Sequence, residues 1–128
     1  MPFEWKAFVD LAGALQQQAG GSRNTEALLR TAISRAYFGA FCHARNYARD
    51  FLGFDPRNTP DDHGGLRAHL KGKRRVGDAE RLDRLRQWRN KGDYLDELAI
   101  DLNATALAAL RDAERVFANL VPPPPKQS

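Results

Sequence analysis

Cysteine and long apolar runs are nearly absent from this 128-residue sequence. Cys42 is the single cysteine, so no disulfide framework can form within one chain. No apolar run approaches the roughly 18 residues of a membrane-spanning helix, and we find no secretory signal peptide. We therefore expect a cytoplasmic protein without a membrane segment.

Several chemical motifs are also missing. The sequence contains neither a glycine-rich phosphate loop nor a Gly-x-Ser-x-Gly nucleophile motif. None of its cysteine or histidine pairs has the spacing of a metal site. We expect no metal and no other cofactor.

The alternation of apolar and polar residues that is typical of strands is absent as well, and helical spacing dominates. This pattern predicts an all-α protein, a four- to five-helix up-down bundle, with a single domain over residues 1–121. The predicted helices span residues 3–18, 25–52, 60–72, 78–92 and 103–121. Their predicted N-caps are Asn24 or Thr25, Thr59, Asp78 and Asn103. Four consecutive prolines end the last helix, so residues 122–128 are predicted to form a disordered tail.

The longest predicted helix, residues 25–52, has two nonpolar or mixed faces. One is a stripe of alanines and larger apolar residues centred on Ile33, which lets a neighbouring helix approach closely. The other mixes an aromatic ring and a thiol with three cations. Its residues are Arg35, Phe38, Cys42, Arg45 and Arg49. Such a helix either lies at the centre of a bundle or shares a face with a second subunit; alternatively, Phe38 packs under a loop.

The formal net charge is +4, and positive charge is concentrated in one short stretch. This basic cluster consists of Lys71, Lys73, Arg74 and Arg75. It is either a solvated loop or a patch that contacts phosphate groups. An anionic partner is therefore one of two interpretations of this charge.

Arg89 occupies an unusual position for a charged residue. On a helical wheel it falls between Leu82 and Leu85, so its guanidinium is directed inward. Because burying an unpartnered charge is costly, we expect Arg89 to face a polar cleft, a partner chain or an anion, or to pair with Asp93 one turn later. Gly92 is a second anomaly, since glycine inside a helix costs about 1 kcal/mol relative to alanine.

Three short segments are informative as a set. Residues 34–41 read Ser-Arg-Ala-Tyr-Phe-Gly-Ala-Phe, residues 63–66 read His-Gly-Gly-Leu, and residues 85–94 read Leu-Arg-Gln-Trp-Arg-Asn-Lys-Gly-Asp-Tyr. The first and last resemble the Ser-Arg-Ala-Tyr-Tyr-Ala-Ala-Phe and Leu-Arg-x-x-Arg-Asn-x-Ala-Asp-Tyr segments of small prokaryotic HEPN-domain proteins. The middle one is similar to a short His-containing segment that many members carry. The resemblance covers about residues 5–120.

The resemblance implies a four- or five-helix bundle that forms a homodimer, with the Arg-Asn segments of both subunits facing one cleft. Many HEPN proteins are metal-independent ribonucleases, often toxins encoded beside a nucleotidyltransferase antitoxin; others are binding companions of such transferases. Their nucleolytic signature is an arginine, four to six residues, and a histidine. Arg89 and Asn90 match its start, but Tyr94 follows the four intervening residues and no histidine lies in the window.

The site prediction centres on residues 85–94. The candidate catalytic residues are Arg89, Asn90 and Tyr94. The candidate RNA- or nucleotide-binding residues are Arg35, Lys71, Lys73, Arg74, Arg75, Arg86, Arg89 and Asn90. A phenol is a poor general base near neutral pH, and His63 or His69 is the alternative base. On an ideal helix Arg89 and Tyr94 point about 140° apart, so they converge only if the helix distorts or ends near Gly92, or if a second subunit completes the site.

From the residues and the resemblance together, we therefore expect a HEPN-like protein that binds RNA or a nucleotide. If it is an enzyme, the resemblance implies a metal-independent ribonuclease of a toxin–antitoxin or defence pair. One alternative is a non-catalytic binding module that recruits a partner through the face of Phe38 and Arg45, or a substrate-binding companion of a nucleotidyltransferase. A scaffolding helical dimer without nucleotide chemistry is the other.

Overall fold

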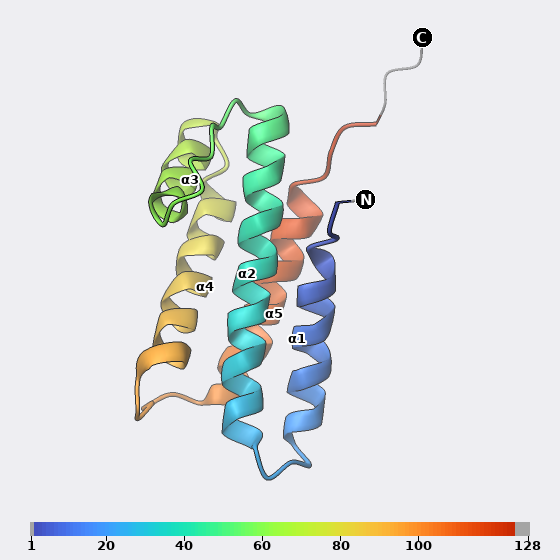
Figure 1. Ribbon diagram of the computed structural model, residues 1–128, viewed down its shortest axis with the longest axis vertical. Helices are drawn as coiled ribbons and strands as arrows, with labels where there is room; N and C mark the ends of the chain where they lie inside the picture. Colours follow the sequence, from blue (N-terminus) through green and yellow to red (C-terminus); the bar gives the residue numbers. More distant parts are fainter. Residues whose placement is uncertain (1, 125–128) are drawn as a thin grey trace.

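The computed structural model describes residues 2–124 and contains five helices and, within that span, no strand (Figure 1). They are α1 (Lys6–Ala19), α2 (Thr25–Phe51), α3 (Asp61–Gly72), α4 (Val76–Tyr94) and α5 (Leu102–Asn119). The prediction of an all-α bundle is confirmed. Residues 122–124 of the predicted tail follow α5 without helix or strand, and residues 125–128 lie outside the described part.

The four long helices run alternately down and up, and the short α3 packs beside the start of α4 (Figure 1). α2 contacts all four other helices, so it is the central element of the bundle. This placement explains its alanine-rich stripe, because its buried residues include Ala32, Ala36, Ala40, Ala44 and Ala48. The small side chains let α1, α4 and α5 pack closely around it.

Gly39 of α2 has the tightest surroundings among the glycines of the described residues. A Cβ atom placed there would lie 2.9 Å from the backbone oxygen of Trp5, 3.0 Å from Cγ2 of Val9 and 3.2 Å from Cβ of Phe8. These distances are shorter than ordinary van der Waals contact. The absence of a side chain at Gly39 therefore sets how closely α1 lies against α2.

Several predicted helix starts differ from the structure. α4 begins at Val76, so Asp78 lies inside its first turn, where it is buried and accepts hydrogen bonds from Asn119 (3.0 Å) and Arg81 (3.2 Å). α5 is capped by Asp101, whose carboxylate accepts from the amide of Ala104 at 3.0 Å, and not by Asn103. Asn24 is the N-cap residue of α2, as predicted, but its side chain makes no capping hydrogen bond, and the N-cap residue of α3 is Pro60 and not Thr59.

The structure also bears on the prediction about membranes. Across the described residues, none of the helices has the combination of length and apolar character that a bilayer-spanning helix needs.

Candidate functional site

A pocket of about 540 Å³ lies where α2, α3 and α4 meet. Its lining residues are Tyr37, Pro60, His63, Gly64, Arg67, Arg86, Arg89, Asn90 and Tyr94. The set contains three arginines and no carboxylate. The volume is in the usual range for a small-ligand site, and the wall has the charge of an anion site.

Arg89 is held in this pocket by its own helix. Its Nε forms an ion pair with Asp93 at 3.0 Å, and its Nη1 donates to the side-chain oxygen of Asn90 at 3.2 Å. The hydroxyl of Ser34 also donates to Asp93, at 3.5 Å. The predicted pair with Asp93 and the predicted polar cleft are therefore both present. They are not alternatives, because Arg89 lines the pocket and also pairs with Asp93, which lies outside the lining.

Tyr94 comes close to Arg89 without a break in the helix. α4 continues through Gly92 to Tyr94, and the Arg89 guanidinium carbon lies 5.9 Å from the centre of the Tyr94 ring. The sequence requires the helix to distort or end near Gly92, or a second subunit to complete the site, and α4 does end at Tyr94, two residues after Gly92. The Gly92 backbone oxygen accepts from Arg30 at 3.0 Å, and a Cβ there would make only ordinary contacts with Arg30 at 3.8 Å.

Arg86 and Arg67 extend the positive wall from two different helices. Nη2 of Arg86 donates to Asp83 at 3.1 Å, and Nε of Arg67 lies 3.6 Å from the same carboxylate. The hydrogen bond from Arg86 lowers the pKa of Asp83. Nε of Arg86 is buried and has no hydrogen-bonding partner among residues 2–124. Two arginines thus share one carboxylate, and one buried donor of Arg86 is left without a partner among the described residues.

His63 lines the same pocket as these arginines, from the first turn of α3. Its ring stacks on Phe41 with centroids 4.0 Å apart and planes 13° apart, and its Nδ1 shares a hydrogen bond with the Tyr37 hydroxyl. Burial, followed by the charges of Arg89 and Arg67, lowers the pKa of His63. Burial raises the pKa of Tyr37 to about 12. His63 is therefore held mainly as neutral imidazole, and Tyr37 as neutral phenol.

The position of His63 depends on the loop before α3. The buried carboxylate of Asp62 accepts the backbone amides of Arg57 and Asn58, both at 2.9 Å. These hydrogen bonds lower the pKa of Asp62. On the other side, Arg67 donates to the backbone oxygen of His63 at 3.0 Å. The start of α3 is therefore fixed from both ends, and with it the histidine.

The structure brings together some of the predicted site residues and not others. Arg86, Arg89, Asn90 and Tyr94 line one pocket, whereas Arg35 and the basic cluster do not. The guanidinium of Arg35 lies over the rings of Phe8 and Phe38, 5.0 and 5.3 Å from their centres. The basic cluster occupies the end of α3 and the turn to α4, and all its members except Arg75 are exposed. A role for these residues in binding RNA or a nucleotide outside this pocket stays a prediction.

Among the polar side chains that line the pocket, two were not predicted as site residues: Arg67 and Tyr37. Arg67 lies four residues after His63, which is the spacing that places two side chains on one helix face, so a signal was present in the sequence. Tyr37 belongs to the buried stripe of α2 and was interpreted as core. His69 lies elsewhere, because its Nε2 donates to the backbone oxygen of Leu52 at 2.6 Å.

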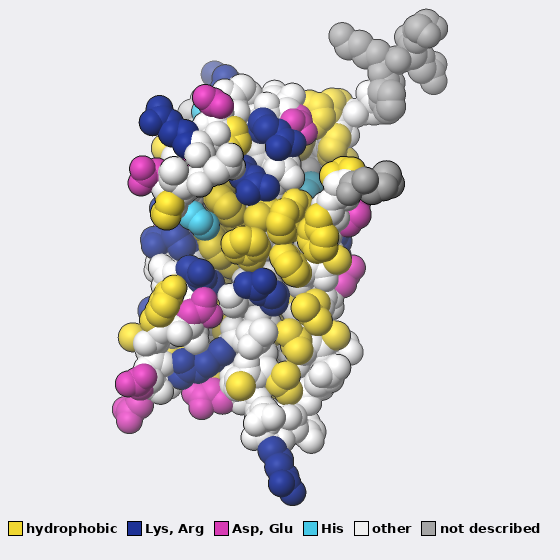
Figure 2. Space-filling view, viewed as in Figure 1, with side chains coloured by type: hydrophobic (Ala, Val, Ile, Leu, Met, Phe, Trp, Pro, Cys, Tyr) yellow, Lys and Arg dark blue, Asp and Glu magenta, His cyan; other side chains and the backbone are white. Residues whose placement is uncertain are grey.

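An aromatic cluster covers the neighbouring part of this face. Phe38 contacts Trp5 and Phe8 of the α1 region, with ring centres 6.0 and 6.2 Å apart, so it packs against α1 and not under a loop. Phe3 adds an exposed ring at 4.8 Å from Trp5. Figure 2 shows hydrophobic side chains gathered in the middle of this face, with lysine and arginine side chains around them.

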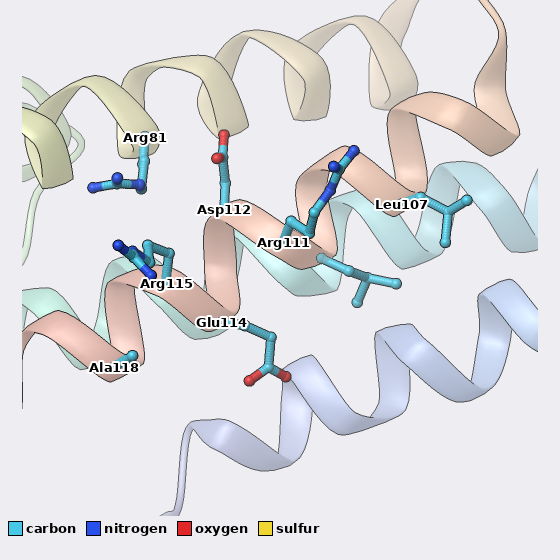
Figure 3. Close-up of a pocket in the computed structure, with 8 residues that line it drawn as sticks. Arg81, Leu107, Arg111, Asp112, Glu114, Arg115 and Ala118 are labelled. Atoms are coloured by element: carbon cyan, nitrogen blue, oxygen red, sulfur yellow. The ribbon is translucent and has the colours of Figure 1, made fainter.

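A second hollow, of about 740 Å³, lies along α5. Figure 3 shows Asp112 directed toward α4 and Glu114 directed toward α1. Asp112 pairs with Arg84 of α4 at 3.0 Å, and Glu114 pairs with Lys6 of α1 at 2.9 Å. The carboxylates of α5 therefore form ion pairs between helices, and this wall mixes both signs of charge. It lacks the uniform charge of the pocket at Arg89.

The pocket thus combines an arginine wall, a neutral histidine and a buried phenol contributed by three helices. Such a set can bind an anion, and the imidazole can accept a proton. Comparison of the chain with protein-family models, with curated proteins and with solved structures gave no match.

Proposed function

We propose that this chain is a HEPN-like protein that binds RNA or a nucleotide through phosphate groups in the pocket between α2, α3 and α4. The observation that carries the proposal is the pocket wall, which contains three arginines and no carboxylate. The planar fork of a guanidinium matches the oxygens of a phosphate group. The Nε of Arg86 is buried and has no hydrogen-bonding partner among residues 2–124, so not all hydrogen-bond donors of this guanidinium are satisfied by the protein.

The family resemblance supports the same site. Its three segments, residues 34–41, 63–66 and 85–94, lie far apart in the sequence and on three different helices. Each contributes to this pocket: Tyr37 from the first, His63 from the second and Arg89 with its neighbours from the third. A set of segments that serves only to fill the core has no reason to meet at a charged hollow.

The wider proposal follows from the resemblance. The protein acts as a homodimer and as a metal-independent ribonuclease in a toxin–antitoxin or defence pair, with a nucleotidyltransferase as its antitoxin. Sedimentation analysis tests the homodimer, since a monomer at working concentration contradicts it. The adjacent reading frame tests the pairing, because a small nucleotidyltransferase gene is expected there.

The phosphate site is tested with a matched pair of arginine variants on α4. We expect Arg86→Gln to weaken binding of a short fluorescent single-stranded RNA by about 10- to 100-fold, since a charged hydrogen bond contributes about 1.5–3 kcal/mol. Arg84→Gln makes the same charge change outside the pocket, where Arg84 pairs with Asp112, and should change binding by about twofold or less. Equal affinities for the two variants contradict the site.

The aromatic cluster favours a second candidate function, a non-catalytic module that recruits a protein partner. The cations Arg35 and Arg45 lie over aromatic rings of this cluster, Arg45 at 5.8 Å from the centre of the Trp5 ring. Phe3 is exposed and the other members of the cluster are partly buried; aromatic and arginine side chains of this kind are enriched at interface centres. This candidate predicts tight partner binding and no RNA turnover. Purified protein that degrades RNA in the presence of a chelator contradicts it.

A further inference from the structure

We infer that His63, and not Tyr94, is the general base of this pocket, and that it takes the proton of a ribose 2′-hydroxyl in bound single-stranded RNA. The inference rests on the proposed phosphate site and adds a reaction to it. It departs from the arginine-to-histidine spacing of the nucleolytic signature, because His63 precedes Arg89 and belongs to a different helix.

The first observation is the orientation of the imidazole. Phe41 supports one face of the ring, and the Tyr37 hydroxyl binds Nδ1. Among residues 2–124, Nε2 has no hydrogen-bonding partner, and it is not a fully buried atom. One nitrogen is therefore fixed by the protein, and the other is left for a substrate in the pocket that His63 lines. A general base needs this arrangement, since its free nitrogen must reach the proton that it removes.

The second observation is the charge around the ring. The titratable or charged groups that face it are Tyr37 from α2, Asp62 and Arg67 from α3, and Arg86 and Arg89 from α4. Burial and the three arginines lower the pKa of His63, and Asp62 opposes them. The ordinary pKa of histidine is about 6.5. Because the pKa of His63 is lowered, its neutral form persists to lower pH than that of an ordinary histidine. A neutral imidazole can accept a proton, and the three arginines beside it can stabilise the negative charge that develops on the phosphate group.

Tyr94 lacks the corresponding support. Its side chain is 72% exposed, and no hydrogen bond within the described residues orients its hydroxyl. The guanidinium of Arg89 approaches the face of its ring. The ring of Tyr94 is therefore placed to stack on a nucleobase or an arginine, and the imidazole of His63 is placed to accept a proton.

The proposed step is an internal transfer at the phosphate. The 2′-oxygen gives its proton to Nε2 of His63 and forms a bond to phosphorus, while the bond from phosphorus to the 5′-oxygen breaks. The leaving 5′-oxygen takes a proton from water, and His63 later returns its proton to solvent. The products are a 2′,3′-cyclic phosphate and a 5′-hydroxyl. Arg67, Arg86 and Arg89 stabilise the charge on the five-coordinate phosphorus.

The test separates cleavage from binding. His63→Gln should cut a single-stranded RNA about 100-fold more slowly or worse in the presence of a chelator, and should bind the 2′-O-methyl form of the same RNA with unchanged affinity. His69→Gln is the matched control on α3, since His69 lies outside the pocket and donates to Leu52. In the wild-type protein, kcat/KM should rise with pH through a midpoint below about 6.5, and this rise should be absent in His63→Gln.

Two results overturn the inference. One is His63→Gln that cleaves at the wild-type rate. The other is wild-type protein that binds the 2′-O-methyl RNA through Arg86 but cuts no RNA; this result leaves the proposed phosphate site intact. If Arg86→Gln binds RNA as tightly as the wild-type protein, the proposed phosphate site fails, which is a different result from either of these. If His63→Gln does not fold, the nuclear magnetic resonance signals of the His63 ring in wild-type protein must shift when 2′-O-methyl RNA binds, and unchanged signals overturn the inference.

Discussion

The charge that Arg89 offers to a ligand depends on its ion pair with Asp93. Its guanidinium is shared between Asp93 and Asn90, and both members of the ion pair with Asp93 are about one-third exposed, at 30% and 27%. A partly exposed pair of this kind contributes about 0–1 kcal/mol to stability. A phosphate ligand therefore competes with Asp93 for the same nitrogen atoms at little cost to the fold.

Removal of the Asp93 charge should strengthen anion binding. We expect Asp93→Asn to raise the affinity for single-stranded RNA by about fivefold, because about 1 kcal/mol of competing interaction is removed. Fluorescence anisotropy measures the affinity. Asp10→Asn is the control, since Asp10 pairs with Lys6 on α1 and lies outside the pocket. Weaker binding by Asp93→Asn would show that Asp93 orients Arg89 more than it neutralises it.

Tyr94 should act through its ring and not through its hydroxyl. The ring is exposed, borders the pocket and lies beside Arg89. Stacking of a base on an aromatic ring contributes about 1–3 kcal/mol, so Tyr94→Ala should weaken RNA binding by about fivefold or more. Tyr94→Phe keeps the ring and should leave binding and cleavage close to wild type. A loss of cleavage in Tyr94→Phe alone returns a catalytic role to the phenol.

At the scale of the helices, Gly39 controls the packing of α1 on α2. Gly39→Ala should lower the free energy of unfolding by about 1–3 kcal/mol, because the added methyl group meets the backbone of Trp5. The gain in helix propensity, about 1 kcal/mol, offsets part of this loss. Gly13→Ala is the control, since nothing lies within 4 Å of a Cβ there and the same propensity gain should stabilise the protein. Urea unfolding measures both, and equal shifts contradict the close contact.

The N-terminus of α5 distinguishes the predicted cap from the observed one. Asp101→Ala should destabilise the protein by about 1 kcal/mol, since its carboxylate accepts the amide of Ala104. Asn103→Ala should have little effect on stability, because Asn103 only accepts a hydrogen bond from Gln16 at an exposed position. Thermal unfolding of the two variants provides the comparison. A larger loss for Asn103→Ala would restore the cap predicted from the sequence.

The sequence determines the helices better than their ends. Apolar spacing identifies all five, because each must bury one face against α2 or α4. The ends depend on single hydrogen bonds, and both Asp101 and Asn103 are residue types that cap helices. Asp78 has the right type for a cap, yet it is buried against Arg81 and Asn119, a tertiary contact that local sequence does not contain. Its role was therefore assigned wrongly.

The site was predictable where its residues are close in sequence. Arg89, Asn90 and Tyr94 lie within one and a half turns of one helix, so their proximity follows from helix geometry. His63 and Arg67 reach the same pocket only because α3 presents one of its faces to α4, and its sparse apolar residues do not define that face. The basic cluster was predicted to bind RNA or a nucleotide because of its charge alone, and the fold places it at the C-terminal end of α3, away from His63.

At the scale of the whole molecule, the pocket and the core share the same central helix. Tyr37 is fully buried in the stripe of α2 that packs the bundle, and its hydroxyl still reaches His63. The site therefore depends on the packing of the core more than on a loop. Its histidine also links the protonation of the pocket to the stability of the bundle.

This link predicts that the bundle loses stability in mild acid. Burial lowers the pKa values of His63 and His43, so the unfolded chain binds more protons than the folded protein below about pH 6.5. The free energy of unfolding should therefore fall between about pH 7.5 and about pH 5.5, as urea titrations can measure. The carboxyl groups with lowered pKa values, including Asp83, lose their contribution only at lower pH. In a protein carrying both His63→Gln and His43→Gln, the free energy of unfolding should no longer fall between about pH 7.5 and about pH 5.5, and should still fall below about pH 4. An unchanged slope in this double variant would assign the acid sensitivity to groups other than these two histidines.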